Sequence, residues 1–338
     1  MADHHKYLLQ KTPDALQQLA HIKTLLQSKQ QANLYLAFEL LKGGGLPHDP
    51  QLYQLMTNHK LGIDLCIRHE FYEVIHQLHI TEQSDWLAHL HRFYNLQKLL
   101  LENYARVQER LPYQAIFEQL SQLPQLSELR IWNHPLHHLP SAIKSLSNLT
   151  HLDLYLDYLV IIPKDIAFST QLKHLRLHSN RLIGLPSEIG ELQQLTSLDL
   201  TNNYLRNLPD AVHQLTRLET VCLRENKFQY FPPQLLKLPQ IKHLDLTANP
   251  IRNLNQEIAQ MQQLESLAIG GEQITQFPTG ILQLKNLKRL ELNYSNIRII
   301  PQKITQMYQL RELVLKGTRI SPIEKRRLQQ ILPHILIS

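Results

Sequence analysis

A pattern of 23 residues repeats without insertion along the chain, and this period restricts the fold more than any other feature of the sequence. The copies follow the pattern LxxLxLxxNxLxxLPxxIxxLxx, with apolar residues at the same places, other residues in place of the asparagine in five copies, and Asn255 in place of one proline. A unit of this length cannot bury its apolar face alone, so consecutive copies must stack into an elongated solenoid. The nine copies begin at Leu126, Leu149, Leu172, Leu195, Leu218, Ile241, Leu264, Leu287 and Leu310.

Within each copy, alternating apolar positions followed by turn residues predict one short strand. Leu175 and Leu177 are two residues apart, which places both side chains on the buried face of a strand. An asparagine such as Asn180 stands where the strand must turn, and its amide can satisfy backbone groups of adjacent coils. Proline, as at Pro186, cannot donate to a strand ladder and takes the chain out of the sheet. A strand beside a wider segment in every copy predicts a curved parallel sheet.

These motifs cover about three fifths of the chain and resemble the leucine-rich-repeat family, in particular its intracellular units of 23 residues. The resemblance implies an α/β fold, a leucine-rich-repeat solenoid whose curved parallel β-sheet forms a horseshoe. It also implies a non-catalytic protein–protein interaction scaffold that binds its partner on the concave face of the sheet.

The rest of the chain predicts end structures for this array. Helical periodicity begins at Thr12 and Pro13, covers residues 31–42 and begins again at Asp49. We interpret residues 1–95 as an α-helical N-terminal region, which is either an elaborate cap or a separate interaction module. The predicted parts are this region at 1–95, a degenerate first repeat at 96–125, nine repeats at 126–320, and a C-terminal capping helix and tail at 321–338.

The C-terminal segment carries the signals of a capping helix. Ser321 is the expected N-cap, with a proline next to it and Glu324 completing a capping box. The periodicity places Ile323, Leu328 and Ile331 against the last coil. A cap is expected because stacking leaves an open core at the end of the array.

The third, fifth and seventh positions of each copy face the concave side, so the candidate partner-binding surface follows from the alignment. Arginine and aspartate alternate in the fifth column, where they either serve solubility and sheet pairing or offer fixed donors and acceptors to a partner. Trp132 and Tyr155 stand at the N-terminal end of the seventh column and are either contact residues or, for Trp132, an anchor beneath residues 1–95. The candidate residues are Arg130, Trp132, Asp153, Tyr155, Arg176, His178, Asp199, Arg224 and Asp245.

The distribution of charge and the number of cysteines limit the class of partner and the cellular compartment that we expect. The net charge is +6, but the three concave columns hold five basic and six acidic residues, so we assign the excess to scattered convex positions. Nucleic-acid binding needs clustered cations, so it becomes a minor hypothesis beside a protein partner. The chain shows no signal sequence, no apolar run of membrane length, and only Cys66 and Cys222. We therefore expect a cytoplasmic monomer without a membrane span.

No catalytic or cofactor motif appears in the sequence, and we expect no enzyme, cofactor or metal. His151 and His174 could be drawn with Asp153 as a metal site, but their spacing matches no ligand motif. Cys222 is flanked by acids on neighbouring strands, which disfavours a reactive thiolate. The alternative that stays open is a regulatory or effector protein whose residues 1–95 carry a separate, possibly enzymatic, activity.

Overall fold

The computed structural model describes residues 13–28, 30–44, 49–58, 60–80, 90–103, 112–155, 158–252, 254 and 256–338. The chain divides into two compact units. The first comprises Met1–Leu78, Asp85–Leu99 and Gln122–Leu126, and the second comprises His79–Ser84, Leu100–Ser121 and Ser127–Ser338. We call them the N-terminal unit and the repeat unit, and each is described by itself.

The N-terminal unit is helical, as predicted. Asp49 caps α3, because its carboxylate accepts a hydrogen bond of 2.8 Å from the Leu52 amide. Phe38 is fully buried, with its ring 6.0 Å from that of His69 and 6.3 Å from that of Phe71. Thr12 lies outside the described residues. The helices are α1 (Pro13–Gln27), α2 (Gln31–Gly44), α3 (Pro50–Thr57) and α4 (Lys60–Arg68), followed by the 3-10 helix η1 (Tyr72–Val74).

One sheet of 12 strands follows chain order from β1 to β12. The prediction of helix over residues 1–95 missed β1, where Leu78 and Ile80 are buried and alternate with exposed residues. The strands are β1 (Gln77–Ile80), β2 (Lys98–Glu102), β3 (Glu128–Trp132), β4 (His151–Tyr155), β5 (His174–Arg176), β6 (Ser197–Asp199), β7 (Thr220–Cys222), β8 (His243–Asp245), β9 (Ser266–Ala268), β10 (Arg289–Glu291), β11 (Glu312–Val314) and β12 (Leu336–Ile337).

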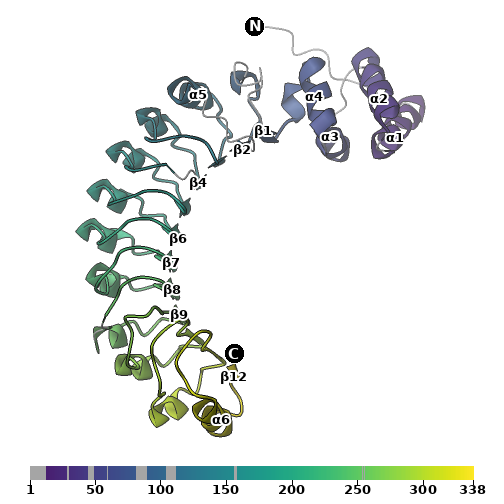
Figure 1. Ribbon diagram of the computed structural model, residues 1–338. Helices are drawn as coiled ribbons and strands as arrows, with labels where there is room; N and C mark the ends of the chain where they lie inside the picture. The colour runs from purple at the N-terminus through teal and green to yellow at the C-terminus, as the bar shows by residue number, and fades with distance from the viewer. Residues whose placement is uncertain are drawn as a thin grey trace. The chain divides into compact units, whose positions relative to one another are not determined.

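The nine predicted repeat strands, β3 to β11, form one continuous parallel sheet. In Figure 1 these strands line the inner side of the curved repeat unit, and the short helices lie on its outer side. The copy that begins at Ile241 has Asn255 in place of the proline of the repeat, and this residue lies outside the described residues. The sheet continues past this copy, because β8 pairs with β9, with His243 opposite Ser266. The outer segments are α5 (Tyr113–Leu120), η3 (Ser141–Ser145), η4 (Lys164–Phe168), η5 (Ser187–Glu191), η6 (Asp210–Gln214), η7 (Pro233–Lys237), η8 (Gln256–Gln260), η9 (Thr279–Gln283) and η10 (Gln302–Gln306).

A ladder of buried asparagines fixes the turn after each central strand. Asn180 donates from Nδ2 to the Leu154 carbonyl at 2.8 Å and accepts at Oδ1 from the Leu159 amide at 3.2 Å. The residue before it, Ser179, has φ of 55°, which the turn requires. The same contacts recur in the following copies, at Asn203, Asn226 and Asn249.

The C-terminal cap is α6 (Pro322–Ile331), and it corrects two details of the prediction. Ser321 caps the helix by accepting from the Glu324 amide at 3.2 Å, but the Glu324 carboxylate accepts instead from the Ile300 amide at 3.1 Å. Leu328 is buried and Ile331 half-buried, whereas Ile323 is 74% exposed, because the first turn faces solvent. The tail then adds β12 beside β11, which covers the edge of the sheet.

Candidate interaction surface

The concave columns form because register brings the same position of each copy side by side. The central residue of these strands, which is leucine except for Val221 of β7, is buried, and the residues flanking it stay at least partly exposed along most of the sheet. Strand pairing places Arg130 opposite Asp153, Asp153 opposite Arg176, and Arg176 opposite Asp199. The structure therefore assembles the predicted fifth column in the predicted order.

Arg176 is the centre of the charged part of this surface. Its Nη1 lies 3.4 Å from Oδ2 of Asp153, and its Nε lies 3.7 Å from Oδ2 of Asp199. Asp153 is nearly buried, and burial raises the pKa of its carboxyl, while Arg176, His178 and Arg130 oppose that shift. Arg130 forms its ion pair with Glu128 of its own strand rather than across the sheet, so the alternating column is interrupted there.

Three aromatic residues occupy the seventh column at the N-terminal end of the surface, and two of their rings stack. Trp132 lies opposite Tyr155 in the register. The rings of Tyr155 and His178 are 4.7 Å apart and nearly parallel, at 4°. His178 also places Nε2 3.7 Å from Oδ1 of Asp153. All three aromatic residues are half-buried, so they present ring surface held in place by neighbours.

In the middle of the concave surface, charged side chains interact with residues of their own copy. Asp245 accepts hydrogen bonds from the Thr247 amide at 2.8 Å and its hydroxyl at 2.6 Å, and burial raises the pKa of this carboxyl. Arg224 pairs with Glu225 at 2.9 Å. Burial and the nearby Asp199 and Asp245 raise the pKa of Cys222 to about 12, so its thiol is protonated at neutral pH and is a poor nucleophile.

Sequence reasoning missed a second charged group at the C-terminal end of the surface. Arg289 pairs with Glu291 at 2.8 Å on its own strand and with Glu312 on the next strand. Asn293 donates to the other oxygen of Glu291 at 2.9 Å. The signal lies in the third column, which holds Arg289 and Glu312 in successive copies, and in the fifth, which holds Glu291.

Two further expectations from the sequence concern a metal site and a membrane-spanning helix. In the part of the chain that is described, no group of three or more His, Cys, Asp and Glu residues is arranged to hold a metal ion. The rings of His151 and His174 stack at 4.3 Å. Among the same residues, no helix is both long and apolar enough to cross a membrane.

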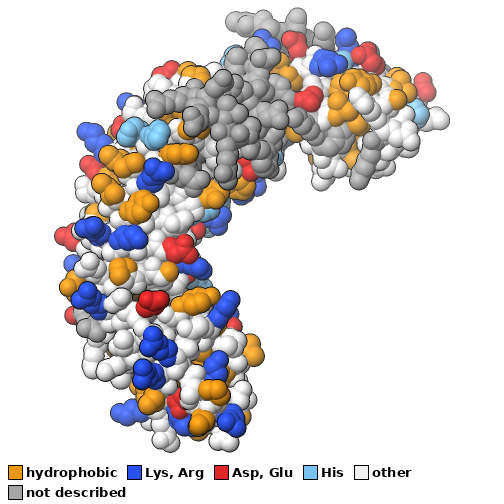
Figure 2. Space-filling view, in the orientation of Figure 1, with side chains coloured by type: hydrophobic (Ala, Val, Ile, Leu, Met, Phe, Trp, Pro, Cys, Tyr) orange, Lys and Arg blue, Asp and Glu red, His pale blue; other side chains and the backbone are white. Residues whose placement is uncertain are grey.

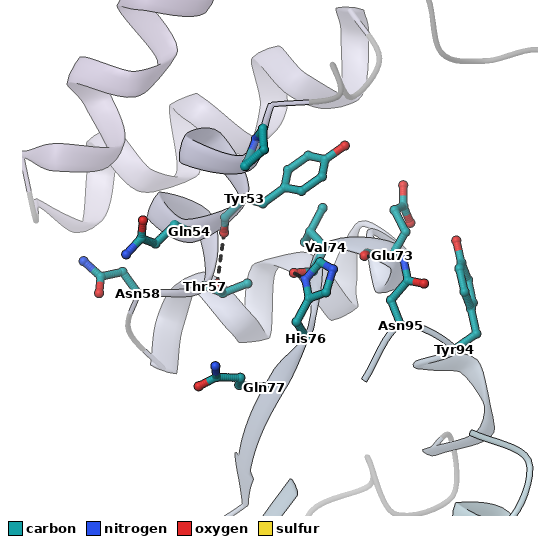
Figure 3. A pocket seen from close by; sticks show the side chains of 11 residues that line it. Tyr53, Gln54, Thr57, Asn58, Glu73, Val74, His76, Gln77, Tyr94 and Asn95 are labelled. Carbon is teal, nitrogen blue, oxygen red and sulfur yellow. Dashed lines mark hydrogen bonds between the residues drawn. The ribbon is translucent and has the colours of Figure 1, made fainter. Parts of the chain in front are cut away.

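A cleft of about 890 Å³ lies within the N-terminal unit, between α3 and the segments that follow it (Figure 3). Glu73 contributes a carboxylate, and burial together with this charge raises the pKa values of Tyr53 and Tyr94. Thr57 donates its hydroxyl to the Tyr53 carbonyl at 2.9 Å, and His76 Nδ1 lies 3.0 Å from the Val74 carbonyl. Among the described lining residues, these contacts do not form a paired nucleophile and base.

The family model described as Leucine rich repeat matches residues 170–228, 193–251 and 262–320. An internalin (InlF) from Listeria monocytogenes is similar in structure, with a TM-score of 0.57 and 18% identity over 88% of this chain and 94% of that chain. The LRR ectodomain of the receptor kinase GASSHO1/SCHENGEN3 from Arabidopsis thaliana has a TM-score of 0.53 and 24% sequence identity over 72% of this chain.

The TLR13–ssRNA13 complex gives a TM-score of 0.52 and 23% identity over 72% of this chain. The chain spans 29% of the plant ectodomain and 33% of the TLR13 chain. A search of curated proteins returns no significant match. Repeat period, sheet and family model agree, and the chain is a leucine-rich-repeat protein.

Proposed function

We propose that this protein is a non-catalytic scaffold that binds a protein partner on the concave face of its repeat sheet. The observation that carries the proposal is the cluster on β3 to β5, where stacked aromatic rings adjoin the ion pairs of Arg176. Tryptophan, tyrosine and arginine are the residues most often found at energetic hot spots of protein interfaces. Leucine-rich-repeat proteins generally act as binding scaffolds rather than enzymes.

The balance of charge supports a protein rather than a nucleic acid as the concave partner. The five basic and six acidic side chains of the concave columns leave that face close to neutral. A phosphate backbone requires clustered cations, whereas a protein surface can match a mixed pattern of donors and acceptors. We further propose a monomer in the cytoplasm, which the two free cysteines Cys66 and Cys222 support.

The test compares partner capture by concave variants with capture by matched controls. Tyr155→Ala and His178→Ala should each weaken capture of a cellular partner by about tenfold or more, and leave the melting temperature nearly unchanged. Tyr308→Ala and His213→Ala remove an exposed tyrosine and an exposed histidine that lie outside the concave columns, and they should preserve capture. Quantitative mass spectrometry of captured proteins measures the first effect, and thermal unfolding measures the second.

Persistence of capture would contradict the proposal. If Trp132→Ala merely lowers the melting temperature, and Tyr155→Ala and His178→Ala still capture the same partner, the aromatic cluster is structural. The runner-up proposal places a separate activity in the N-terminal unit, and its cleft is the observation that favours it. Loss of capture in Tyr94→Ala, with capture retained by both concave variants, would support that alternative.

A further inference from the structure

Basic side chains gather on one flank of the repeat unit, on the loops that leave the concave sheet. The outward residues there occupy the tenth, twelfth and thirteenth positions of each copy, and we call those of the second to sixth copies the lateral strip. None of these positions holds an aspartate or a glutamate. The strip contains four exposed cations in four consecutive copies, namely Arg181, Arg206, Lys227 and Arg252.

The cations of the lateral strip differ from those on neighbouring surfaces in their partners. On the concave face, Arg176 pairs with two aspartates. On the second position of the repeat, Lys242 pairs with Glu219 at 3.1 Å, and the same pairing recurs in later copies. Within the part of the chain that is described, Arg206 and Arg252 have no ion pair. Among the described residues, Arg206 and Arg252 thus expose positive charge that no ion pair neutralises.

Acidic residues precede the positions of the strip in the sequence of their copies and do not occur at those positions. Asp157, Glu225 and Glu272 occupy the eighth or ninth position of their copies. Glu225 is already paired with Arg224 of the concave face, at 2.9 Å.

The backbone holds the strip in a regular register. The amides of Arg181, Tyr204 and Lys227 donate to the Leu159, Leu182 and Leu205 carbonyls of the preceding copies, at 2.9, 2.9 and 2.8 Å. The buried asparagine ladder fixes the same loops from within. Side chains of the strip consequently project from a rigid frame, which lowers the entropy lost when a partner binds.

Hydrophobic surface lies between these cations. Ile183, Tyr204 and Tyr230 belong to the strip and are 64%, 50% and 75% exposed. Figure 2 shows basic and hydrophobic side chains along one face of the repeat array, with acidic side chains among them. Exposed apolar side chains that recur in neighbouring copies form a patch of the kind that marks an interaction site.

We propose that the lateral strip binds an acidic polypeptide segment in which carboxylates alternate with aromatic or aliphatic side chains. Carboxylates would pair with the arginines, which bind them in a bidentate manner, and the apolar side chains would cover Ile183 and Tyr230. This surface is separate from the concave face and adds a second binding site to the scaffold.

The contacts within the strip favour a peptide over a single-stranded nucleic acid. The Arg181 guanidinium lies over the Tyr158 ring at 5.1 Å, and the Lys227 ammonium lies 6.0 Å from the Tyr204 ring centre. A ring face covered by a cation is not an open platform for a nucleobase, and nucleic-acid grooves depend on such platforms. Ile183 offers aliphatic surface, which an acidic peptide with apolar side chains can cover.

The test uses fluorescence anisotropy with a fluorescein-labelled peptide of about 12 residues that alternates glutamate with tyrosine and leucine, long enough to span the strip. At about 0.15 M salt, the full-length protein should bind this peptide. The triple variant Arg206→Gln, Lys227→Gln and Arg252→Gln should bind it about tenfold more weakly. The control variant Lys242→Gln, Lys288→Gln and Arg311→Gln removes the same charge from the second column and should bind nearly as well as the wild type.

Further arms separate the possible partners. Tyr204→Ser with Tyr230→Ser keeps every charge and should weaken binding severalfold. Absence of binding by the wild type, or equal losses in the two triple variants, would overturn the proposal. Equal affinity for an all-glutamate peptide would show charge attraction alone, which also overturns it. Tighter binding of a labelled oligouridine that is lost in the lateral triple variant would identify a nucleic-acid surface instead.

Discussion

Asn203 illustrates how one buried amide serves four backbone groups in this fold, of which three have the shortest hydrogen bonds. Its Oδ1 accepts from the Leu182 amide at 3.0 Å, and its Nδ2 donates to the Leu177 and Leu200 carbonyls at 2.9 and 3.0 Å. The side chain therefore connects its own coil to the one before it. Backbone groups buried at this depth have no water to replace the amide, so they depend on it.

Replacing Asn203 with alanine should lower the free energy of unfolding by about 1–3 kcal/mol, because buried backbone groups lose their partners. Chemical denaturation of the full chain, with the midpoint and slope fitted together, measures the loss. Asn207→Ala removes an exposed asparagine four residues away and should change stability by less than about 0.5 kcal/mol. Equal effects of the two substitutions would show that water takes over the role of the Asn203 amide.

At the scale of the element, the strands are too short to be stable by themselves. β5 to β11 contain three residues each, and their central residues stack in register from one copy to the next. Leu198 of β6 is fully buried and lies opposite Leu175 on one side and Val221 on the other. Stability in such an array comes from the interfaces between neighbouring copies rather than from a single core.

Leu198→Ala should therefore cost about 2–5 kcal/mol and loosen the adjacent copies before distant ones. Hydrogen exchange followed by mass spectrometry should show the greatest loss of protection in β5, β6 and β7. Ile183→Ala, at an exposed position of the neighbouring loop, serves as the control and should leave exchange unchanged. A uniform increase in exchange along the repeat unit would indicate global cooperativity and contradict the local expectation.

The sequence predicted the elements that repeat and the helices at the two ends of the array, but it missed the strands β1 and β12, which occur once. Nine strands and the asparagine ladder follow from a period, since each copy confirms the phase of the others. β1 and β12 have no copy to compare with. The alternation in β1 is short and lies beside helical segments, and β12 consists of only two residues, Leu336 and Ile337. The ion-pair partner of Arg130 was also missed. The rotamer of this long side chain determines whether it pairs with Glu128 on its own strand or with Asp153 on the next strand, and residue spacing does not determine the rotamer.

At the scale of the whole molecule, the net charge of +6 is unevenly distributed. The concave columns pair most of their charges internally, while the lateral strip exposes cations beside hydrophobic side chains. The affinity for a partner on the concave face should therefore change little with salt concentration, whereas the affinity for an acidic partner on the strip should fall strongly as salt increases. Salt dependence would distinguish the two proposed surfaces without a substitution.

The same distribution predicts the response of the intact chain to nucleic acid. Generic duplex DNA, single-stranded DNA and RNA should not bind with submicromolar affinity at physiological salt, because the four cations of the strip stand one to a copy and the concave face is nearly neutral. Anisotropy titrations of labelled oligonucleotides over a range of salt concentrations measure the affinity and the slope of its dependence on salt. Removing three strip cations should leave the weak binding nearly unchanged, since few phosphates are neutralised. Submicromolar binding with a steep salt slope would reverse this expectation and make nucleic acid the leading partner.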